Sequence, residues 1–398
     1  MLKRLTVVLV CLVVAMVGLS GCGKSNSTKH DPEVDSGYNS NENNGNHNND
    51  HNDPDDDDTD TGIKNVIVMI GDGFGPNHLT NAKRYFGINK FAYEDDYICA
   101  VTTRSLDSTV TDSAAAATAL ATGRKVNNYE VGQHLGEDIE NIMEIARASG
   151  KKTGIMTSDE LYGATPAAYS AHTYSRNNAE EIMLDQMQSG IDIFVGARGS
   201  DLYNDVYFEQ GFREQGYTYL DKASQLANLD PNQKYLATFD SLQSPCDSNV
   251  VGDYPAAITN VLNYLDNENG FCLMIENAYI DKYSHGNYFN GAMWEVRYFA
   301  EMIEAVYQFC ANRNDTVVII TADHETGGLQ LGTGVNNLND QLYTTTNHTE
   351  AYVNLYIKYP TDDKRKNYKT YVSNTQIFKI CQTAVREQIF DLTLILDD

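Results

Sequence analysis

Positive charge is scarce in this sequence: 29 lysines and arginines stand against 55 aspartates and glutamates, which gives a formal net charge of −26 at pH 7. A surface that binds nucleic acid needs basic side chains to neutralise phosphates, so this excess of acid argues against a nucleic-acid partner. Cys-x-x-Cys pairs, which are typical of structural zinc sites, are absent as well. No internal repeat is visible, and a repeat architecture is therefore not expected.

Cysteine is also sparse, with seven residues. Cys11 and Cys22 lie in and directly after the N-terminal apolar stretch, so five cysteines remain for the rest of the chain. If the chain is exported, an odd count leaves at least one thiol unpaired, and the pairing of the others stays open. The five are Cys99, Cys246, Cys272, Cys310 and Cys381.

The N-terminus has the pattern of a secretion signal. Lys3 and Arg4 precede an apolar stretch over 5–19, which has the length of a signal h-region and is short for a membrane span. The stretch ends in Leu-Ser-Gly-Cys, which resembles the lipobox of bacterial lipoproteins. We expect 1–21 to be a lipoprotein signal peptide and an acylated Cys22 to hold the protein to the cell membrane or envelope surface, outside the cytoplasm. The alternative is an ordinary or uncleaved signal peptide.

A polar segment follows over 22–62. After the cysteine, only Val34 and Tyr38 are sizeable apolar side chains, and the rest is mostly Asn, Asp, Ser, Gly and His. Such a segment cannot bury enough surface to offset the entropy cost of ordering it, so we expect a disordered linker. The remainder, 63–398, is long enough for one large α/β domain with a substantial core.

Short apolar runs in this remainder predict buried strands over 64–70, 154–157, 193–196, 271–275 and 314–321. Helical patterns lie between them, over 112–122, 141–148 and 292–310. Strands that alternate with helices favour a three-layer α/β/α sandwich with a central, mostly parallel sheet.

Four chemically active side chains fall directly at or after the ends of predicted strands: Asp72, Glu276, Asp323 and His324. Ligands of open parallel sheets bind beyond the carboxyl ends of the strands, so these side chains are candidates for one site. Each alone has an ordinary explanation, such as a turn, a helix cap or a surface ion pair. Carboxylates with imidazoles favour zinc, whereas a site with only oxygen ligands suits magnesium.

Asp281 and His285 are four residues apart, so they would share one face of a helical turn and could reach a single cation. A surface ion pair explains them equally well. His348 cannot be interpreted alone.

Ser113 directly precedes an alanine-rich helical pattern. The first turn of a helix leaves N–H groups free and carries partial positive charge, so a serine there can meet an anionic substrate. The alternative is a helix cap beside Asp112. With no adjacent base and no Gly-x-Ser-x-Gly elbow, this serine needs metal coordination to ionise. Arg176 is a candidate fork for two phosphate oxygens, or else a surface arginine.

Taken together, these segments resemble the alkaline phosphatase family from about Asn65 to Val353. Six blocks occur in the family's order: Met69-Ile70-Gly71-Asp72-Gly73; Thr111-Asp112-Ser113-Ala114-Ala115; Ala164-Thr165-Pro166-Ala167-Ala168 with Ala171-His172 and Ser175-Arg176; Glu276 with Ile280-Asp281-Lys282 and His285; Thr321-Ala322-Asp323-His324; and His348-Thr349.

The resemblance implies three metal positions. One zinc would be held by Asp281, His285 and His348. A second zinc, which also binds the Ser113 oxygen, would be held by Asp72, Asp323 and His324. A magnesium would be bound by Asp72, Thr165 and Glu276.

The resemblance also implies a function, the hydrolysis of small phosphate monoesters through a phosphoserine on Ser113, with release of inorganic phosphate outside the cytoplasm. Arg176 would grip the phosphate, Asp112 would orient Arg176, and Lys282 would lie near the phosphate. Family members are often homodimers, but no residue here reports an interface.

One position departs from the pattern. Bacterial members with a lysine after the metal-binding aspartate commonly have an aspartate where this chain has Gly163. That carboxylate would support the water shell of magnesium, so its loss predicts an altered magnesium affinity, since such losses typically cost about 10–100-fold. The alternatives to a phosphomonoesterase are a phosphodiesterase, sulfatase or phosphonate hydrolase of the same superfamily, or a non-catalytic surface lipoprotein that binds metal or phosphate.

Overall fold

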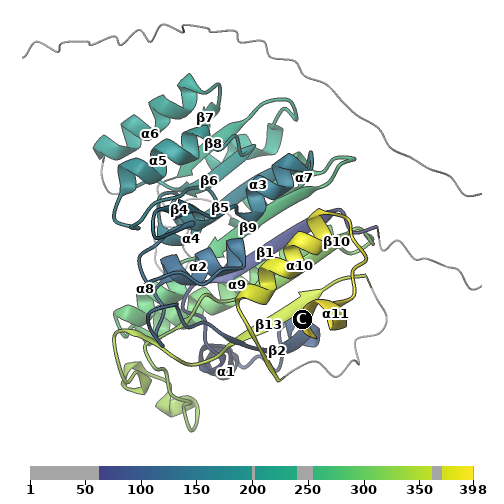
Figure 1. The fold of residues 1–398 in the computed structure, drawn as a ribbon. Coiled ribbons are helices and arrows are strands. Elements are labelled where there is room, and N and C mark those ends of the chain that lie inside the picture. The colour runs from purple at the N-terminus through teal and green to yellow at the C-terminus, as the bar shows by residue number, and fades with distance from the viewer. Residues whose placement is uncertain (1–61, 200–201, 240–253, 361–369, 398) are drawn as a thin grey trace, which may run out of the picture. The chain divides into compact units, whose positions relative to one another are not determined.

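The computed structural model describes residues 62–199, 202–239, 254–360 and 370–397, and a large β-sheet runs through them (Figure 1). Its strands follow the order β14-β2-β13-β10-β1-β9-β5-β6-β8-β7. In that order their bounds are Tyr371–Ser373, Tyr97–Thr102, Val353–Lys358, Thr316–Thr321, Asn65–Gly71, Phe271–Asn277, Lys152–Glu160, Ile193–Ala197, Tyr235–Phe239 and Thr218–Leu220. Neighbours run parallel except at β13, which is antiparallel to β10 and β2. The predicted mostly parallel sheet is confirmed.

Helices cover both faces of this sheet and complete three layers (Figure 1). Helices α2, α3, α4 and α10 pack together on one face, and α1, α7 and α8 pack against α9 on the other. In chain order, the helices α1 to α11 are Pro76–Phe86, Ser113–Thr122, Ile142–Ala148, Ala164–Ala168, Ala179–Gln188, Leu202–Glu214, Tyr254–Leu265, Tyr279–His285, Phe289–Phe309, Thr375–Val385 and Leu392–Asp397. The predicted α/β/α sandwich is therefore also confirmed.

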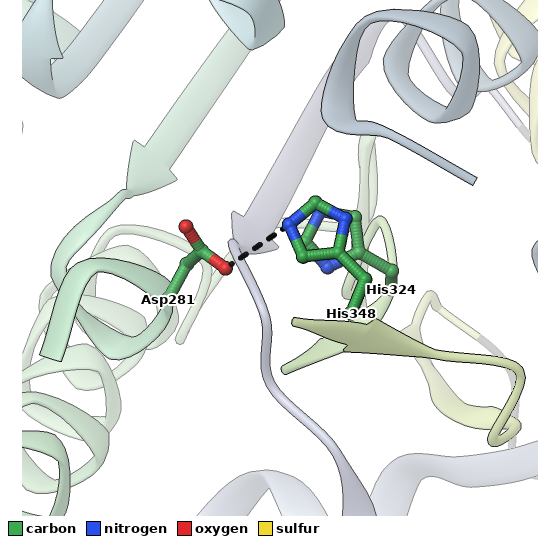
Figure 2. Close-up of side chains that lie close together, drawn as sticks. All are labelled: Asp281, His324 and His348. Atoms are coloured by element: carbon green, nitrogen blue, oxygen red, sulfur yellow. Dashed lines mark ion pairs between the residues drawn. The ribbon is translucent and has the colours of Figure 1, made fainter. Parts of the chain in front are cut away.

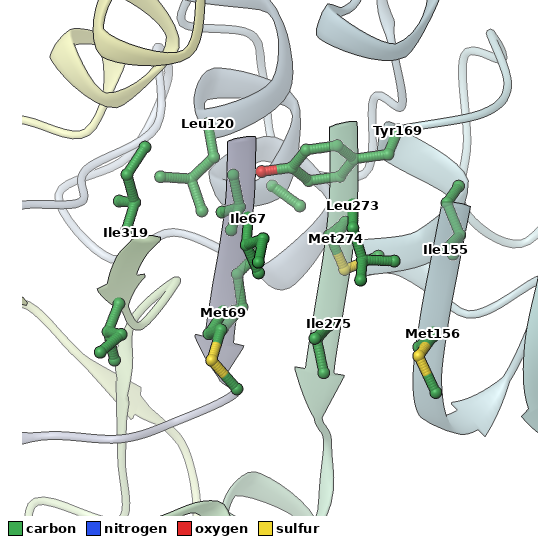
Figure 3. Packing of buried hydrophobic residues seen from close by; sticks show 14 of the residues in the cluster. Ile67, Met69, Leu120, Ile155, Met156, Tyr169, Leu273, Met274, Ile275 and Ile319 are labelled. Carbon is green, nitrogen blue, oxygen red and sulfur yellow. The ribbon is translucent and has the colours of Figure 1, made fainter. Parts of the chain in front are cut away.

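The central strands are buried along their whole length. Every residue of β1 and β9 is buried, because helices cover both faces and the strands must be apolar on both sides. Figure 3 shows Ile67, Ile155 and Ile275 from three of these strands in one cluster with Leu120 of α2 and Tyr169. Each fully buried aliphatic side chain contributes about 1.5–3 kcal/mol to folding. This core holds the strand ends in fixed positions.

Helix α2 is buried at all ten positions, and its alanines favour the helix and allow close packing against α4 and α10. It starts after Asp112, whose Oδ1 accepts the N–H of Ala115 at 3.0 Å. It ends at Gly123, whose φ of +70° is the left-handed conformation of a helix C-terminus. The first residue of this helix is thus held rigidly at the edge of the core.

The five strands and three helices predicted from the sequence are present as β1, β5, β6, β9 and β10 and as α2, α3 and α9. The shorter or outer strands β2, β7, β8, β13 and β14 were not predicted. Two small antiparallel ribbons are separate from the main sheet: β3 (Gln133–His134) with β4 (Glu137–Asp138), and β11 (Glu325–Thr326) with β12 (His348–Thr349).

Several predictions concern residues outside the described ranges: the signal peptide 1–21, the lipidated Cys22, nearly all of the linker 22–62, and Cys246. Four of the five cysteines in the domain are described, and all are buried and free: Cys99, Cys272, Cys310 and Cys381. Among the described helices, none combines the length and the apolar character that a membrane crossing requires.

Candidate active site

Acidic and histidine side chains converge at the carboxyl ends of three neighbouring strands. Asp72 directly follows β1, Glu276 is the second-last residue of β9, and Asp323 and His324 come just after β10. In the sheet register, Ile70 of β1 pairs with the last residue of β10 on one side and with Glu276 on the other. The parallel pairing of β10, β1 and β9 therefore places these residues at the same edge of the sheet.

Asp72, Asp323 and His324 form the first group, with one ligand atom from each within 4.8 Å of the others. His324 Nε2 lies 3.1 Å from Asp323 Oδ2 and 3.5 Å from Asp72 Oδ1. The second oxygen of Asp323, Oδ1, accepts the N–H groups of Gly73 at 3.1 Å and His324 at 2.9 Å. The backbone thus fixes one Asp323 oxygen and leaves the other directed at the group.

Three buried side-chain oxygens of this region accept no hydrogen bond, as is expected of atoms that bind cations. They are Asp72 Oδ1, Asp323 Oδ2 and Thr165 Oγ1. Burial raises the pKa of Asp72 well above its usual value, and the charges of Asp323, Asp281 and Glu276 raise it further. Buried carboxylates that lie this close together are costly, and a divalent cation is a group that offsets their charge. The donor set therefore fits metal ions.

His285 and His348 form a second group with Asp281. Their Nδ1 atoms contact backbone carbonyls, that of Thr346 at 2.6 Å and that of Thr111 at 2.9 Å. Because a carbonyl only accepts, each Nδ1 carries the proton and each Nε2 presents its lone pair. The Nε2 atoms lie 3.1 Å apart and 3.3 and 3.6 Å from Asp281 Oδ1. Rings oriented by carbonyls in this manner are typical of metal ligands.

The two groups adjoin each other through His324. Figure 2 shows Asp281 facing the His348 ring, with His324 stacked on that ring. The ring centroids are 3.5 Å apart and the planes differ by 22°. Burial lowers the pKa of His348 to about 4, and the nearby His324 acts in the same direction. His348 is therefore neutral at pH 7, as a metal ligand must be.

Thr326 of β11 links the groups and was missed by the sequence patterns. Its hydroxyl donates to Asp281 Oδ1 and lies 3.2 Å from His324 Nδ1. A hydroxyl has one proton, so with that proton given to Asp281 its oxygen accepts from His324 Nδ1. His324 Nε2 then faces the first group. Burial opposes protonation of this ring, but the charge and hydrogen bond of Asp323, with the charge of Asp281, raise the pKa of His324. Gly73, with φ of +73°, permits this approach, because a Cβ there would lie 2.8 Å from Asp281 Cα and 2.9 Å from Thr326 Oγ1.

Ser113 is the first residue of α2 and is buried, with Oγ 3.2 Å from His324 Nε2. The helix cap is Asp112, so the alternative explanation of Ser113 as the cap does not hold. The hydroxyl is instead directed at the first group. It lies where the N-terminus of α2 presents free N–H groups and partial positive charge.

Asp112 holds Arg176 as well as the helix. Its Oδ1 accepts the N–H groups of Ala115 and, at 3.2 Å, Tyr129, and its Oδ2 lies 3.2 Å from Arg176 Nη1. The Arg176 backbone N–H also donates to Tyr129 O at 2.8 Å. The guanidinium is thus positioned near Ser113 through a shared carboxylate, with donors left for an anion.

Glu276 and Thr165 lie beside these groups. Glu276 Oε2 accepts a hydrogen bond from the Thr157 hydroxyl. Burial, and then the charge of Asp159, raise the pKa of Glu276 to about 8 despite the opposing effect of Thr157 and Thr165. With Asp72 these residues provide only oxygen ligands, which suits magnesium.

Lys282 forms an ion pair with Asp159, a residue that the sequence analysis did not single out. The strand β5 runs on to Glu160, beyond the predicted end at 157, and so carries Asp159 to this place. A Cβ at Gly163 would lie 3.1 Å from Asp159 Oδ2. Position 163 has no carboxylate of its own, but the carboxylate of Asp159 lies beside it.

The sequence profile of the family described as Alkaline phosphatase matches residues 63–197 and 195–389, which span most of the chain. This chain belongs to the alkaline phosphatase family. Two relatives in this family come from Bacillus subtilis strain 168. Alkaline phosphatase 4 is 34% identical over 303 residues, covering 68% of this chain and 63% of the relative. Alkaline phosphatase 3 is 32% identical over 338 residues, covering 79% of this chain and 72% of the relative.

Solved alkaline phosphatases have the same fold. The cold-active enzyme from the psychrophile Shewanella sp. superposes with a TM-score of 0.72 at 26% identity, covering 81% of this chain and 99% of that enzyme. The enzyme of the Antarctic bacterium TAB5 superposes with a TM-score of 0.70 at 25% identity, covering 82% and 98%.

Proposed function

We propose that this member of the alkaline phosphatase family is a metal-dependent hydrolase of small phosphate monoesters that acts through a phosphoserine intermediate. The observation that carries the proposal is the place of Ser113, whose Oγ lies 3.2 Å from His324 Nε2 at the N-terminus of α2 and beside carboxylates with unpaired oxygens. The relatives named alkaline phosphatase support the reaction class.

Two zinc ions and one magnesium ion fit the donor atoms. The first zinc would be held by Asp281, His285 and His348, the second by Asp72, Asp323 and His324, and magnesium by Asp72, Thr165 and Glu276. A variant of the TAB5 enzyme has been solved with magnesium bound, which supports the third position. Bound zinc would supply a Lewis acid that lowers the pKa of a coordinated hydroxyl and offsets phosphate charge.

The side chains of this chain provide the nucleophile and the alignment. The Ser113 oxygen, after loss of its proton, attacks phosphorus in line with the ester bond. That bond breaks, the alcohol departs with a proton, and a phosphoserine remains. Water then attacks the phosphoserine, inorganic phosphate leaves, and Ser113 regains its proton. Arg176, oriented by Asp112, offers paired N–H donors to two phosphate oxygens and so fixes the ester for attack.

The substitution Ser113→Ala tests this proposal. We expect hydrolysis of p-nitrophenyl phosphate to fall by about 10³-fold or more, with both zinc equivalents retained in elemental analysis. Ser149→Ala, at the far end of α3, is the matched control and should keep full activity. Near wild-type turnover in Ser113→Ala would show that the nucleophile is another group. Rates on a monoester, a diester and a sulfate ester decide the substrate class, and a preference for either of the last two would overturn the proposal.

The proposal extends to location. A lipid-anchored Cys22 would place the domain at the outer surface of the cell membrane or envelope, where inorganic phosphate is released. The support is the Leu-Ser-Gly-Cys sequence after an apolar stretch. Full-length protein should fractionate with membranes, and Cys22→Ala should release it. Equal partition of the two would refute the anchor.

A further inference from the structure

Consecutive side chains at the end of β5 join this strand to β9 and α8. The Thr157 hydroxyl donates to Glu276 Oε2, and its oxygen accepts the Asp159 N–H at 2.9 Å. Ser158 Oγ accepts the backbone N–H just before α8 at 2.8 Å. Asp159 in turn pairs with Lys282 of α8. The Asp159 carboxylate is thus held from its backbone and from its charged end, between Glu276 and α8.

Gly163 makes room for this carboxylate. A Cβ at that position would lie 3.1 Å from Asp159 Oδ2 and 2.9 Å from Glu160 O. The φ of Gly163 is −58°, which any residue adopts, so the requirement for glycine comes from space rather than from backbone conformation. A side chain at 163 would therefore press on the Glu160 carbonyl, and the Asp159 carboxylate would have to give way by a few tenths of an ångström.

Asp159 adds a second negative charge to the oxygen ligands at Glu276. The Asp159 N–H donates to the Thr157 hydroxyl, which itself donates to Glu276 Oε2, so two hydrogen bonds connect Asp159 to Glu276. The Thr165 hydroxyl oxygen in the same region is buried and accepts no hydrogen bond. Lys282 offsets Asp159 only in part, because its side chain is 42% exposed and its ammonium lies also over the Tyr279 ring, 5.0 Å from the centroid.

We propose that Asp159 is a positioning residue of the magnesium position at Glu276 and Thr165, where its charge strengthens cation binding and Lys282 moderates that effect. The identity of the cation rests on the proposed function. Asp159 then supplies the negative charge that relatives with an aspartate at the position of Gly163 would supply from there. Magnesium affinity is set in this chain by the opposed charges of Asp159 and Lys282.

Calorimetric titration of the zinc-loaded protein with magnesium, without substrate, tests the inference. Asp159→Asn should weaken magnesium binding by about 10-fold or more, the size typical of lost outer carboxylates. Lys282→Met should strengthen it, because the positive charge that opposes the cation is removed. The matched control is Asp221→Asn, an exposed carboxylate after the edge strand β7, which should leave the affinity unchanged. Zinc content should stay at two equivalents in all variants.

The double variant Asp159→Asn/Lys282→Met tests whether the two residues affect magnesium affinity together or independently. With Asp159 absent, the lysine change should no longer strengthen magnesium binding beyond the parent protein. The proposal falls if Asp159→Asn binds magnesium within about twofold of the parent. If Asp159→Asn does not fold, Lys282→Met alone decides, since unchanged or weaker binding overturns the inference. A parent protein that binds magnesium in this way but hydrolyses no phosphate monoester would refute only the proposed function.

Discussion

The Nε2 atoms of His285 and His348 lie 3.1 Å apart, while each ring turns its Nδ1 to a backbone carbonyl. With each Nδ1 turned to a carbonyl, both Nε2 atoms point into one small space, an arrangement that a cation between them would stabilise. Asp281 Oδ1 lies within 3.6 Å of both nitrogens. The three side chains are thus already arranged in a geometry that can bind a cation.

Loss of one of these ligands should release one zinc. We expect Asp281→Ala and His348→Ala each to lower the zinc content by about one equivalent in elemental analysis, because two remaining ligands bind zinc weakly. His134→Ala is the matched control, since His134 also pairs with an acid four residues away, Glu130, at 2.8 Å. Two equivalents of zinc retained in Asp281→Ala would contradict this ligand set.

Asp112 both caps α2 and orients Arg176, and different substitutions can separate these two roles. Asn caps a helix as well as Asp does, so Asp112→Asn should keep the thermal midpoint but weaken the hold on Arg176 and raise the inhibition constant of inorganic phosphate. Asp112→Ala should show the same raised constant and also lose about 1 kcal/mol of unfolding free energy. A normal phosphate constant in both variants would show that Arg176 does not need this carboxylate.

Alanine substitutions at Gly73 and Gly87 can separate the cost of backbone strain from the cost of a steric clash between the new Cβ and its neighbours. Both have positive φ, +73° and +66°, so alanine costs each about 1–2 kcal/mol in conformation. At Gly87 a Cβ meets nothing within 4 Å, whereas at Gly73 it meets the Asp281 backbone at 2.8 Å. Gly73→Ala should therefore unfold at lower denaturant concentration than Gly87→Ala and also lose zinc. Equal unfolding midpoints and equal zinc contents would mean that α8 can move away without cost.

The metal-free protein should lose stability as pH rises. The folded-state pKa of Glu276 is raised to about 8 from a usual 4.5, so its contribution is full below about pH 4.5 and disappears as pH approaches 8. Asp72, with a pKa shifted the same way, adds to the trend. Thermal midpoints in chelator, measured across this range, should fall more steeply for the parent than for Glu276→Gln. The metal-loaded protein should not show the difference, because cations stabilise the ionised carboxylates. Parallel curves in chelator would exclude Glu276 as the source.

Sequence patterns could predict where the strands end, and from that the convergence of Asp72, Glu276 and Asp323. The reason is physical: a buried parallel strand must be apolar on both faces, and the first polar residue after it lies at the carboxyl edge of the sheet. The position of Ser113 could be predicted for a similar reason, because the start of an alanine-rich helix can be recognised in the sequence.

The contacts that finish the site could not be predicted in this way. Thr157 meets Glu276 across 119 residues of sequence, Asp159 meets Lys282 across 123, and Thr326 meets Asp281 across 45. No local period or cap links such partners, since their meeting depends on sheet order and register. The loss of a carboxylate at Gly163 was for this reason inferred from one position alone, whereas in the folded chain the Asp159 carboxylate lies beside it, 3.1 Å from where a Cβ at 163 would be.

The buried thiols have a practical consequence. Cys99, Cys272, Cys310 and Cys381 are free, and burial raises the pKa of Cys272 to about 12, so almost none of its reactive thiolate forms at neutral pH. The described residues therefore contain four free thiols, and their fold relies on apolar packing and, under the proposed function, on bound cations. Such a domain can be produced in a reducing host cytosol, and dithiothreitol should leave its melting curve unchanged, whereas a chelator should not.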